Sequence, residues 1–423
     1  MAPITAMTKT PMAVRLSGVL ALLGTMALSG CSGLADRLPL ELFVVLGSNA
    51  DENISEGLRE SFRSRIMPLQ ESFRRLHPDT HFQMGLYPES DMARALARRN
   101  AEGLAPDVLL LTGDMALQLL EAGLIDPFPL STNERRLFNP EDLRRLTTPD
   151  GRLAGMPLLV FPQLSCFNPR QMPTPPATAR QLLEASASGQ PIGLTTSMDS
   201  LLWSVGSLGA LPALIRLSNG QGLSPTAADR QTLGAWLSWL QEAGIQQRVT
   251  FYPDQQTAEV ELVAGRVAWI PCRSSAVNGL RRQMGGSLAV APLPDGNGHQ
   301  ASPPNRLRVA ALGRNSSPRG RERALEYMRF TVNPLNQRSL TLGSQSMLPA
   351  NRFVNVPAQS SKTLATLVRA ADQGRQANPI VGVVHDNDRR LPALQTLITA
   401  LVYGEINATE ATPQLIRILQ ERP

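Results

Sequence analysis

The chain has 423 residues, of which 42% are hydrophobic and 18% charged, and its formal net charge is +6. This composition is ordinary for a globular protein, and about 390 residues beyond the N-terminal segment are more than one core normally holds, so two or three domains are expected. The positive charge does not indicate a nucleic-acid partner. Arginine pairs such as Arg74-Arg75 and Arg281-Arg282 are short and scattered, and no basic run is interleaved with aromatics.

The first 31 residues have the organisation of an export signal. Lys9 and Arg15 precede an apolar stretch over 16–27, which is far shorter than the roughly 20 residues of a spanning helix. The sequence Leu-Ser-Gly-Cys then ends at Cys31 and resembles the bacterial lipobox. That resemblance implies cleavage after residue 30 and acylation of Cys31, with the acyl chains anchoring the protein to a membrane. The alternatives are an ordinary signal peptide with a chance cysteine and a buried N-terminal helix.

Apolar strands alternate with helices beyond a short linker over 31–38. Strands are expected over 40–46, 81–87 and 108–111. Helices are expected over 54–76 with an interruption at Pro68, over 89–99, and from residue 114 to residue 123. This alternation predicts an α/β fold with a largely parallel sheet, and ligands of such sheets gather at the carboxyl ends of the strands.

The remaining cysteines and the histidines give no sign of catalytic or metal chemistry. Outside the cytoplasm, Cys166 and Cys272 are compatible with one disulfide or with two buried thiols. Pro78 separates His77 from His81 and breaks the helix that metal binding at this spacing needs. No nucleophile elbow or phosphate loop is present, so neither an enzyme nor a cofactor is expected.

Several stretches along the chain resemble the family 1 extracellular solute-binding proteins, the maltose-binding-like captors of ABC importers. The stretch PDVLLLTGDMALQLLEAGLIDPF is similar to the family's strand, loop and helix, and DGRLAGMPLLVFPQLSCFN to its crossover between lobes. VELVAGRVAWIPCRS is similar to a helix end and strand of the family. Each motif is weak alone, but they follow one another in the family's order, at 106–128, 150–168, 260–274, 291–298, 310–350 and 401–419.

The resemblance implies a periplasmic-binding-protein fold, in which two lobes, each a mostly parallel sheet flanked by helices, are joined by a hinge. The expected division is a signal peptide over 1–30, an N-terminal lobe over 39–159 and 309–353, and a C-terminal lobe over 160–308 and 354–423. The implied function is capture of a sugar-like small solute between the lobes by a monomer on the periplasmic side of the envelope, and its delivery to an ABC permease. Hinge closure would signal the captured solute to the permease.

Eight positions that match the family's pattern are candidates for contact with the solute. Ser48 and Asn49 lie in the loop after the first strand. Asp114 matches an aspartate that accepts hydrogen bonds from sugar hydroxyls, but its position suits an N-cap equally well. Trp203 matches a tryptophan near the cleft, although a large aromatic at helical spacing is more often part of a core.

The other candidates depart from the family's aromatic-lined sites. Ser200 and Ser274, together with Leu111, stand where sugar-binding members carry aromatic rings, and Phe161 stands at a cleft position that is usually polar. A long oligosaccharide is therefore not favoured. Arg273 can pair with a carboxylate or phosphate or serve as a solvated charge at the rim. A disaccharide, a small polyol glycoside and an anionic solute remain open.

Two other classes of function compete with transport. The same scaffold can act as a sensor or structural lipoprotein of the envelope, which the shortage of aromatics favours. An envelope hydrolase would need a pair of carboxylates facing each other, and pairs such as Glu259 and Glu261 cannot be assigned to that role from the sequence.

Overall fold

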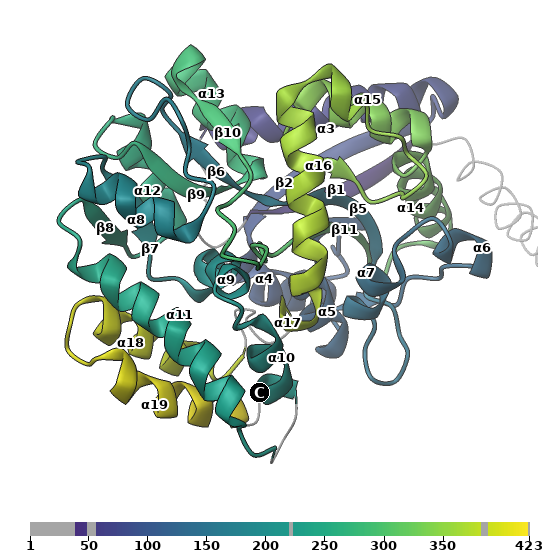
Figure 1. Ribbon diagram of the computed structural model, residues 1–423. Helices are drawn as coiled ribbons and strands as arrows, with labels where there is room; N and C mark the ends of the chain where they lie inside the picture. Colours follow the sequence, from purple (N-terminus) through teal and green to yellow (C-terminus); the bar gives the residue numbers. More distant parts are fainter. Residues whose placement is uncertain (1–38, 49–55, 220–222, 382–387, 422–423) are drawn as a thin grey trace, which may run out of the picture.

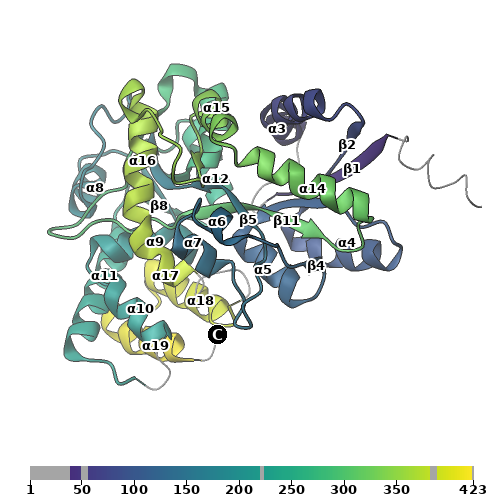
Figure 2. The same cartoon turned by 90° about the vertical axis from the view of Figure 1, so that its right-hand side faces the viewer.

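The computed structural model describes residues 39–48, 56–219, 223–381 and 388–421. Two lobes lie side by side, each built on a sheet with helices on both faces (Figures 1 and 2). The predicted two-lobed α/β class is confirmed. None of the helices within the described ranges combines the length and apolar character needed to cross a membrane.

Seven strands form the first sheet in the described part of the chain, in the order β12-β5-β11-β3-β1-β2 with β4 beside β11. Its strands are β1 (Leu40–Ser48), β2 (Thr80–Pro88), β3 (Val108–Thr112), β4 (Ile125–Asp126), β5 (Met156–Phe161), β11 (Arg306–Gly313) and β12 (Leu348–Pro349). The helices of this lobe are α3 (Glu56–Leu76), α4 (Glu89–Ala101), α5 (Gly113–Glu121), α6 (Thr132–Arg135), α7 (Pro140–Arg145), α14 (Pro318–Thr331) and α15 (Pro334–Ser344).

The second sheet has five strands among the described residues, in the order β10-β6-β9-β7-β8. They are β6 (Gln163–Phe167), β7 (Ile192–Thr195), β8 (Val249–Tyr252), β9 (Trp269–Arg273) and β10 (Ala289–Ala291). Its helices are α8 (Ala179–Ala187), α9 (Met198–Ser207), α10 (Leu211–Asn219), α11 (Ala227–Ile245), α12 (Gln255–Val263), α13 (Val277–Met284), α16 (Lys362–Gly374), α17 (Asn378–Val381), α18 (Leu391–Val402) and α19 (Ala408–Gln420). Short 3-10 turns are η1 (Ser274–Ala276), η2 (Gly285–Ser287), η3 (Ala358–Ser360) and η4 (Arg375–Ala377).

The predicted strands and helices of the first lobe are present, with two corrections. Helix α3 continues through Pro68, where an interruption was expected. A proline inside a helix removes one backbone hydrogen bond, and here the helix is held by the packing of its apolar face, where Phe73 is buried.

The second correction concerns strand direction, since both sheets are mixed and not mostly parallel. Strand β1 runs parallel to β2 and β3, but β11 runs antiparallel to β3, β4 and β5. In the second sheet β7 is parallel to β8 and β9, whereas β6 is antiparallel to β9 and β10. Strands β6 and β11 both enter their sheets from the other lobe, which fixes their direction independently of the strand–helix alternation.

Each lobe has its own hydrophobic core. The first core packs β1, β3 and β11 against α4, α5 and α14. The second sheet is covered on both faces: α9, α11, α18 and α19 pack on one face, and α12, α13 and α16 on the other. Strand β6 serves both faces by alternation, since Phe167 points to the first of these clusters and Leu164 to the second.

Within the described residues the chain passes between the lobes three times. Pro162 alone separates β5 from β6, residues 301–305 lead into β11, and residues 350–361 lead from β12 to α16. Crossing segments of this kind are the places where a hinge between lobes can bend.

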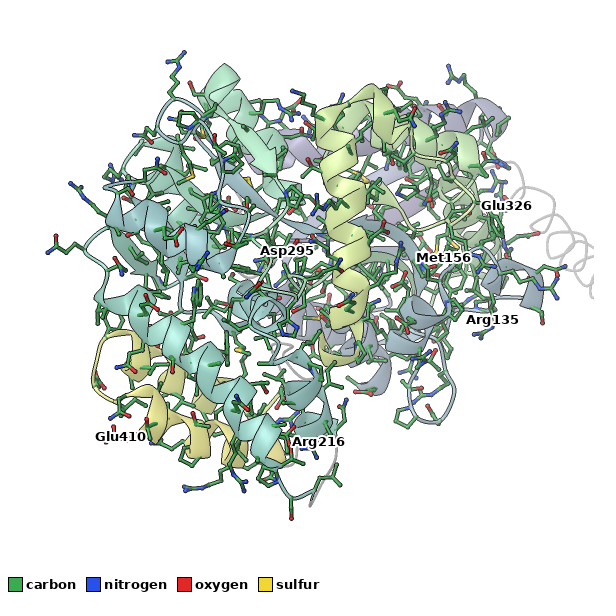
Figure 3. All side chains as sticks on the ribbon, viewed as in Figure 1. Arg135, Met156, Arg216, Asp295, Glu326 and Glu410 are labelled. Carbon is green, nitrogen blue, oxygen red and sulfur yellow. A yellow bond between two sulfur atoms is a disulfide. The ribbon has the colours of Figure 1, made fainter. Side chains whose placement is uncertain are left out.

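The second crossing is fixed by hydrogen bonds on either side. Asp295, labelled in Figure 3, accepts from the Ala301 amide (2.8 Å) and from the Gln373 side chain (2.9 Å). The hydroxyl of Ser302 donates to the Leu202 carbonyl at 2.8 Å. The segment that enters β11 is therefore held against α9 and α16 of the second lobe.

Candidate functional site at the boundary between the lobes

Polar groups gather at the carboxyl ends of β1 and β3. Glu89, which opens α4, accepts hydrogen bonds from the Thr112 amide (2.8 Å) and hydroxyl (2.5 Å). Its carboxylate lies 3.2 Å from Nη1 of Arg308, and this Nη1 also donates to the Gly47 carbonyl at 2.9 Å. Burial raises the pKa of Glu89, although the Arg308 charge acts in the opposite direction. The next residue after Gly47, Ser48, is completely buried.

A second charged cluster joins the two lobes. Asp199, in the first turn of α9, receives Nη2 of Arg273 at 2.8 Å and Nη2 of Arg306 at 2.7 Å, both on the oxygen Oδ2. Burial alone would raise the pKa of Asp199, but the charges of Arg306 and Arg273 outweigh it and lower the pKa to about 2. Asp199 is therefore ionised at every physiological pH.

A network of amides and hydroxyls continues along the edge of the second sheet. The Gln163 amide donates to the Ser200 carbonyl at 3.0 Å, and the Ser200 hydroxyl donates to Gln255 Oε1 at 3.5 Å. Gln255 in turn donates to the Pro271 carbonyl at 2.6 Å. These bonds hold the first turn of α9 against the ends of β6 and β9, where Ser274 follows.

Three buried polar atoms near this boundary have no hydrogen-bond partner within the described part of the chain: Ser48 Oγ, Gln163 Oε1 and Ser274 Oγ. Their residues are at most 4% exposed. Buried hydroxyls and amides nearly always have a partner, so such atoms mark places for a water or a ligand group. These three atoms could form hydrogen bonds with a polar solute. The arginines beside them are already paired with carboxylates of the protein.

The structure places five of the candidate residues from the sequence at or near this boundary. Phe161 ends β5 and pairs with Arg306 across the sheet, and Ser200 is buried in α9. Ser48, Arg273 and Ser274 lie at the ends of buried strands, next to the two charged clusters. Asn49 and Cys31 lie outside the described residues.

The surroundings of Asp114 and Trp203 test the alternative role that the sequence suggests for each of them. Asp114 lies in the first turn of α5 and is not its N-cap; that role belongs to Thr112, whose hydroxyl accepts from the Met115 amide. Trp203 is fully buried and packs edge-to-face on Trp239 (5.8 Å between centroids) and Trp269 (6.1 Å). This placement favours the core interpretation of Trp203.

Sequence reasoning missed four charged residues of the site: Glu89, Asp199, Arg306 and Arg308. Their significance depends on contacts between residues 74 to 219 positions apart, as for Asp199 with Arg273 and Glu89 with Arg308. The one local signal is that Arg306 and Arg308 are two residues apart in a strand, so their side chains point to the same face of the sheet.

Cys166 and Cys272 form a disulfide, with their Cα atoms 5.7 Å apart. In the register of β6 and β9, Cys166 pairs with Ile270 and Leu164 pairs with Cys272, so the cysteines are diagonal neighbours on one face. Both are fully buried. The bridge ties the first crossing strand to the strand that carries Arg273. The described residues hold no group of three or more side chains suited to a metal ion.

A separate hollow of about 490 Å³ lies between α11 and α19, lined by residues that include Arg230, Gly234 and Thr412. It belongs to the second lobe alone. No buried polar atom without a partner is found among the residues that line it. The boundary between the lobes is therefore the better candidate site.

Comparisons with known proteins agree with this architecture. The profile of the bacterial extracellular solute-binding proteins matches residues 71–366, which is more than half of the chain. The fold is similar to that of the GacH receptor of Streptomyces glaucescens, solved unliganded and with acarbose, with a TM-score of 0.70 and 16% identity over 91% of this chain and 100% of that one.

Two further structures have the same fold. The maltose-maltodextrin binding protein of Alicyclobacillus acidocaldarius aligns with a TM-score of 0.64 and 16% identity, over 90% of this chain and 100% of that chain. The maltose-binding protein of Listeria monocytogenes aligns with a TM-score of 0.65 and 15% identity, over 90% and 97%. A comparison with curated protein sequences gave no match. These relatives are solute-binding proteins and not enzymes, and the chain belongs to the family of bacterial extracellular solute-binding proteins.

Proposed function

We propose that this protein is the lipid-anchored solute-binding component of an ABC importer, which captures a small, uncharged, hydroxyl-rich solute at the boundary between its lobes. The proposal includes two lobes whose boundaries differ slightly from the 159/160 and 308/309 expected from the sequence: because β5 and β11 lie wholly in the first sheet, the first lobe comprises residues 39–161 and 306–353, and the second comprises 162–305 and 354–423. It also includes action as a monomer on the periplasmic side of the envelope, and delivery of the solute to a permease.

The observation that carries the proposal is the set of buried polar atoms without partners, Ser48 Oγ, Gln163 Oε1 and Ser274 Oγ. Two of them are hydroxyls, which both donate and accept, as the hydroxyls of a sugar or polyol do. A solute that bonded these atoms would remove the cost of leaving them buried and unpaired.

Charge supports an uncharged solute. Arg273 and Arg306 converge on Asp199, and Arg308 pairs with Glu89. A carboxylate or phosphate would have to compete with these protein carboxylates for each guanidinium. A neutral solute needs no such exchange.

Solutes of the relatives point in the same direction. The GacH receptor was solved with acarbose and the Listeria protein with maltose, and a cyclo/maltodextrin-binding protein of similar fold with maltotetraose. At the positions where this chain has Leu111, Ser200 and Ser274, an aromatic platform for a long chain of sugar rings is lacking. A solute of one or two rings, or a polyol glycoside, fits these side chains better.

A thermal-shift screen tests the proposed solute class. The full exported chain, with Cys31 replaced by Ser to keep it in solution, is heated with neutral disaccharides, polyols and organic acids. A ligand at 100 times its Kd stabilises by about 2.7 kcal/mol, which raises Tm by roughly 5–10 °C for lobes of this size. We expect such a rise with a neutral solute and none with the acids.

Matched serine variants connect the shift to the site. Ser48→Ala and Ser274→Ala should reduce the shift, whereas Ser186→Ala should not, because Ser186 Oγ is also buried without a partner but lies in α8. If only organic acids raise Tm, the charge argument is wrong. If no solute does so, a non-transport envelope lipoprotein becomes the better assignment.

Anchoring is tested separately. Mass spectrometry of the mature protein should find Cys31 as the N-terminal residue with an acyl modification, and Cys31→Ser should release the protein from membranes. An unmodified N-terminus elsewhere would reject the anchor and leave the solute-binding role intact.

A further inference from the structure

Asp199 lies in α9 of the second lobe but contacts an arginine from each of the two sheets. Its Oδ2 atom receives Arg306 Nη2 at 2.7 Å and Arg273 Nη2 at 2.8 Å. Arg306 opens β11 and pairs with Phe161 of β5, so it is part of the first sheet. Arg273 ends β9 and pairs with Gln163 of β6, so it is part of the second sheet. One carboxylate oxygen thus joins the two sheets.

The cluster lies at the crossings through which the chain passes between the lobes. Gln163 and Phe161 flank Pro162, the single residue of the first crossing, and Arg306 follows the second crossing directly. A contact at this place acts on the axis about which the lobes would turn. The three charged side chains are between 13% and 26% exposed, so water screens their interaction only in part.

Asp199 also prevents repulsion between its partners. The two Nη2 atoms are at most about 5.5 Å apart, because each lies within 2.8 Å of the same oxygen. Two cations at this distance repel one another when the intervening negative charge is removed. The ionised state of Asp199, whose pKa is lowered to about 2, fits this role.

We propose that Asp199 is a positioning residue that fixes the relative orientation of the two lobes, by holding one arginine from each sheet at the crossings between them. The importance of this orientation for solute capture rests on the proposed function. The clasp itself, meaning Asp199 with Arg273 and Arg306, does not, because its three side chains all belong to this chain and contact one another directly.

The first lobe offers a matched control with the same chemistry. Asp79 also contacts two arginines, Arg319 at 3.1 Å and Arg323 at 2.9 Å, and all three residues belong to the first lobe. Asp79→Asn therefore removes one carboxylate from between two arginines without touching the boundary between lobes.

The experiment measures the distance between the lobes by double electron–electron resonance on the full exported chain without solute. Spin labels are placed on cysteines that replace exposed Glu102 and Glu405, one in each lobe, in a Cys31→Ser background. Asp199→Asn keeps the shape of the side chain and removes its charge. We expect its distance distribution to be at least twice as wide as that of the parent or shifted by several ångströms, and Asp79→Asn to match the parent.

Two arginine variants keep the proposal testable if Asp199→Asn fails to fold. Arg306→Gln removes the charged contact between Arg306 and Asp199 and leaves Asp199 with Arg273, so it should also widen the distribution. Arg306→Lys retains the charge and should give the parental distribution. A parental distribution for folded Asp199→Asn or Arg306→Gln would overturn the clasp. That result would not affect the proposed solute, and a failed solute screen would not affect these distances.

Discussion

The buried disulfide allows a quantitative prediction of stability. Replacing Cys166 and Cys272 by Ser removes a cross-link between positions 106 residues apart. In the chain-entropy treatment, opening a loop of this length increases the conformational entropy of the unfolded chain, which lowers its free energy by about 4.8 kcal/mol at 25 °C. Native bridges commonly stabilise by 2–5 kcal/mol, so we expect the free energy of unfolding to fall by about 3–5 kcal/mol.

The tryptophans make this loss measurable in the lobe that contains the bridge. All four tryptophans of the chain lie in the core on one face of the second sheet: Trp203, Trp236, Trp239 and Trp269. Their fluorescence in a urea titration therefore reports unfolding of the second lobe, and the Cys31→Ser parent serves as reference. At a slope of about 3 kcal/mol per molar urea, the midpoint should fall by 1 M or more.

Two results would refute this reasoning. Free thiols titrated in the unfolded, unreduced parent would show that the bridge does not form. A double serine variant whose unfolding free energy falls by less than about 1 kcal/mol would show that the bridge constrains the unfolded chain far less than its loop length implies.

Three further predictions follow from buried charges and close contacts. The pKa of Asp199 is lowered from the usual 3.8 to about 2, so at acidic pH the folded protein binds fewer protons than the unfolded chain. The free energy of unfolding, measured by urea titration, should therefore fall by about 2 kcal/mol between pH 5 and pH 2, and this part of the fall should be absent in Asp199→Asn. Gly47→Ala places a Cβ 2.5 Å from Oε1 of buried Glu89, and thermal unfolding should show a loss of about 1–3 kcal/mol. Arg390→Met leaves the buried Asp388 carboxylate without its ion partner, and denaturant titration should show a fall of about 3–5 kcal/mol in the free energy of unfolding. An unchanged midpoint would mean that the carboxylate is neutralised in another way.

The sequence is a good guide to the strands and helices of the first lobe, because their patterns are local. The apolar run of β1 is buried over its second half, and the strand predicted over 108–111 is the buried β3, which α5 follows directly. Strand direction is not local: β11 follows an excursion of more than 140 residues after β5, and nothing within it indicates that it runs antiparallel to its neighbours. Likewise, Cys166 and Cys272 become a bonded pair only once the register of β6 and β9 is known.

The site shows the same division between local and long-range information. Ser48 can be singled out because it follows the first predicted strand, at the end where α/β proteins bind ligands. Ser274 can be singled out only through the resemblance to the solute-binding family, whose sugar-binding members carry an aromatic ring at that place. Asp199 carried no such signal, since an aspartate in a first helical turn is common on electrostatic grounds alone. Its role depends on two arginines 74 and 107 residues further along the chain.

Pairing of arginines also changes what the positive charge of the chain implies. A net charge of +6 and a free arginine at the rim would favour an anionic solute. Arg273 and Arg306 instead share Asp199, so in the proposed site recognition rests on hydroxyls and amides, whose hydrogen bonds are individually weak. Several weak hydrogen bonds bind well only when their groups are held in place before the solute arrives, because ordering them on binding would cost affinity. A residue that fixes the lobes relative to one another therefore matters more for the binding of a neutral solute than for the binding of an ion. By this argument Asp199 would influence the affinity of the proposed site without itself bonding the solute.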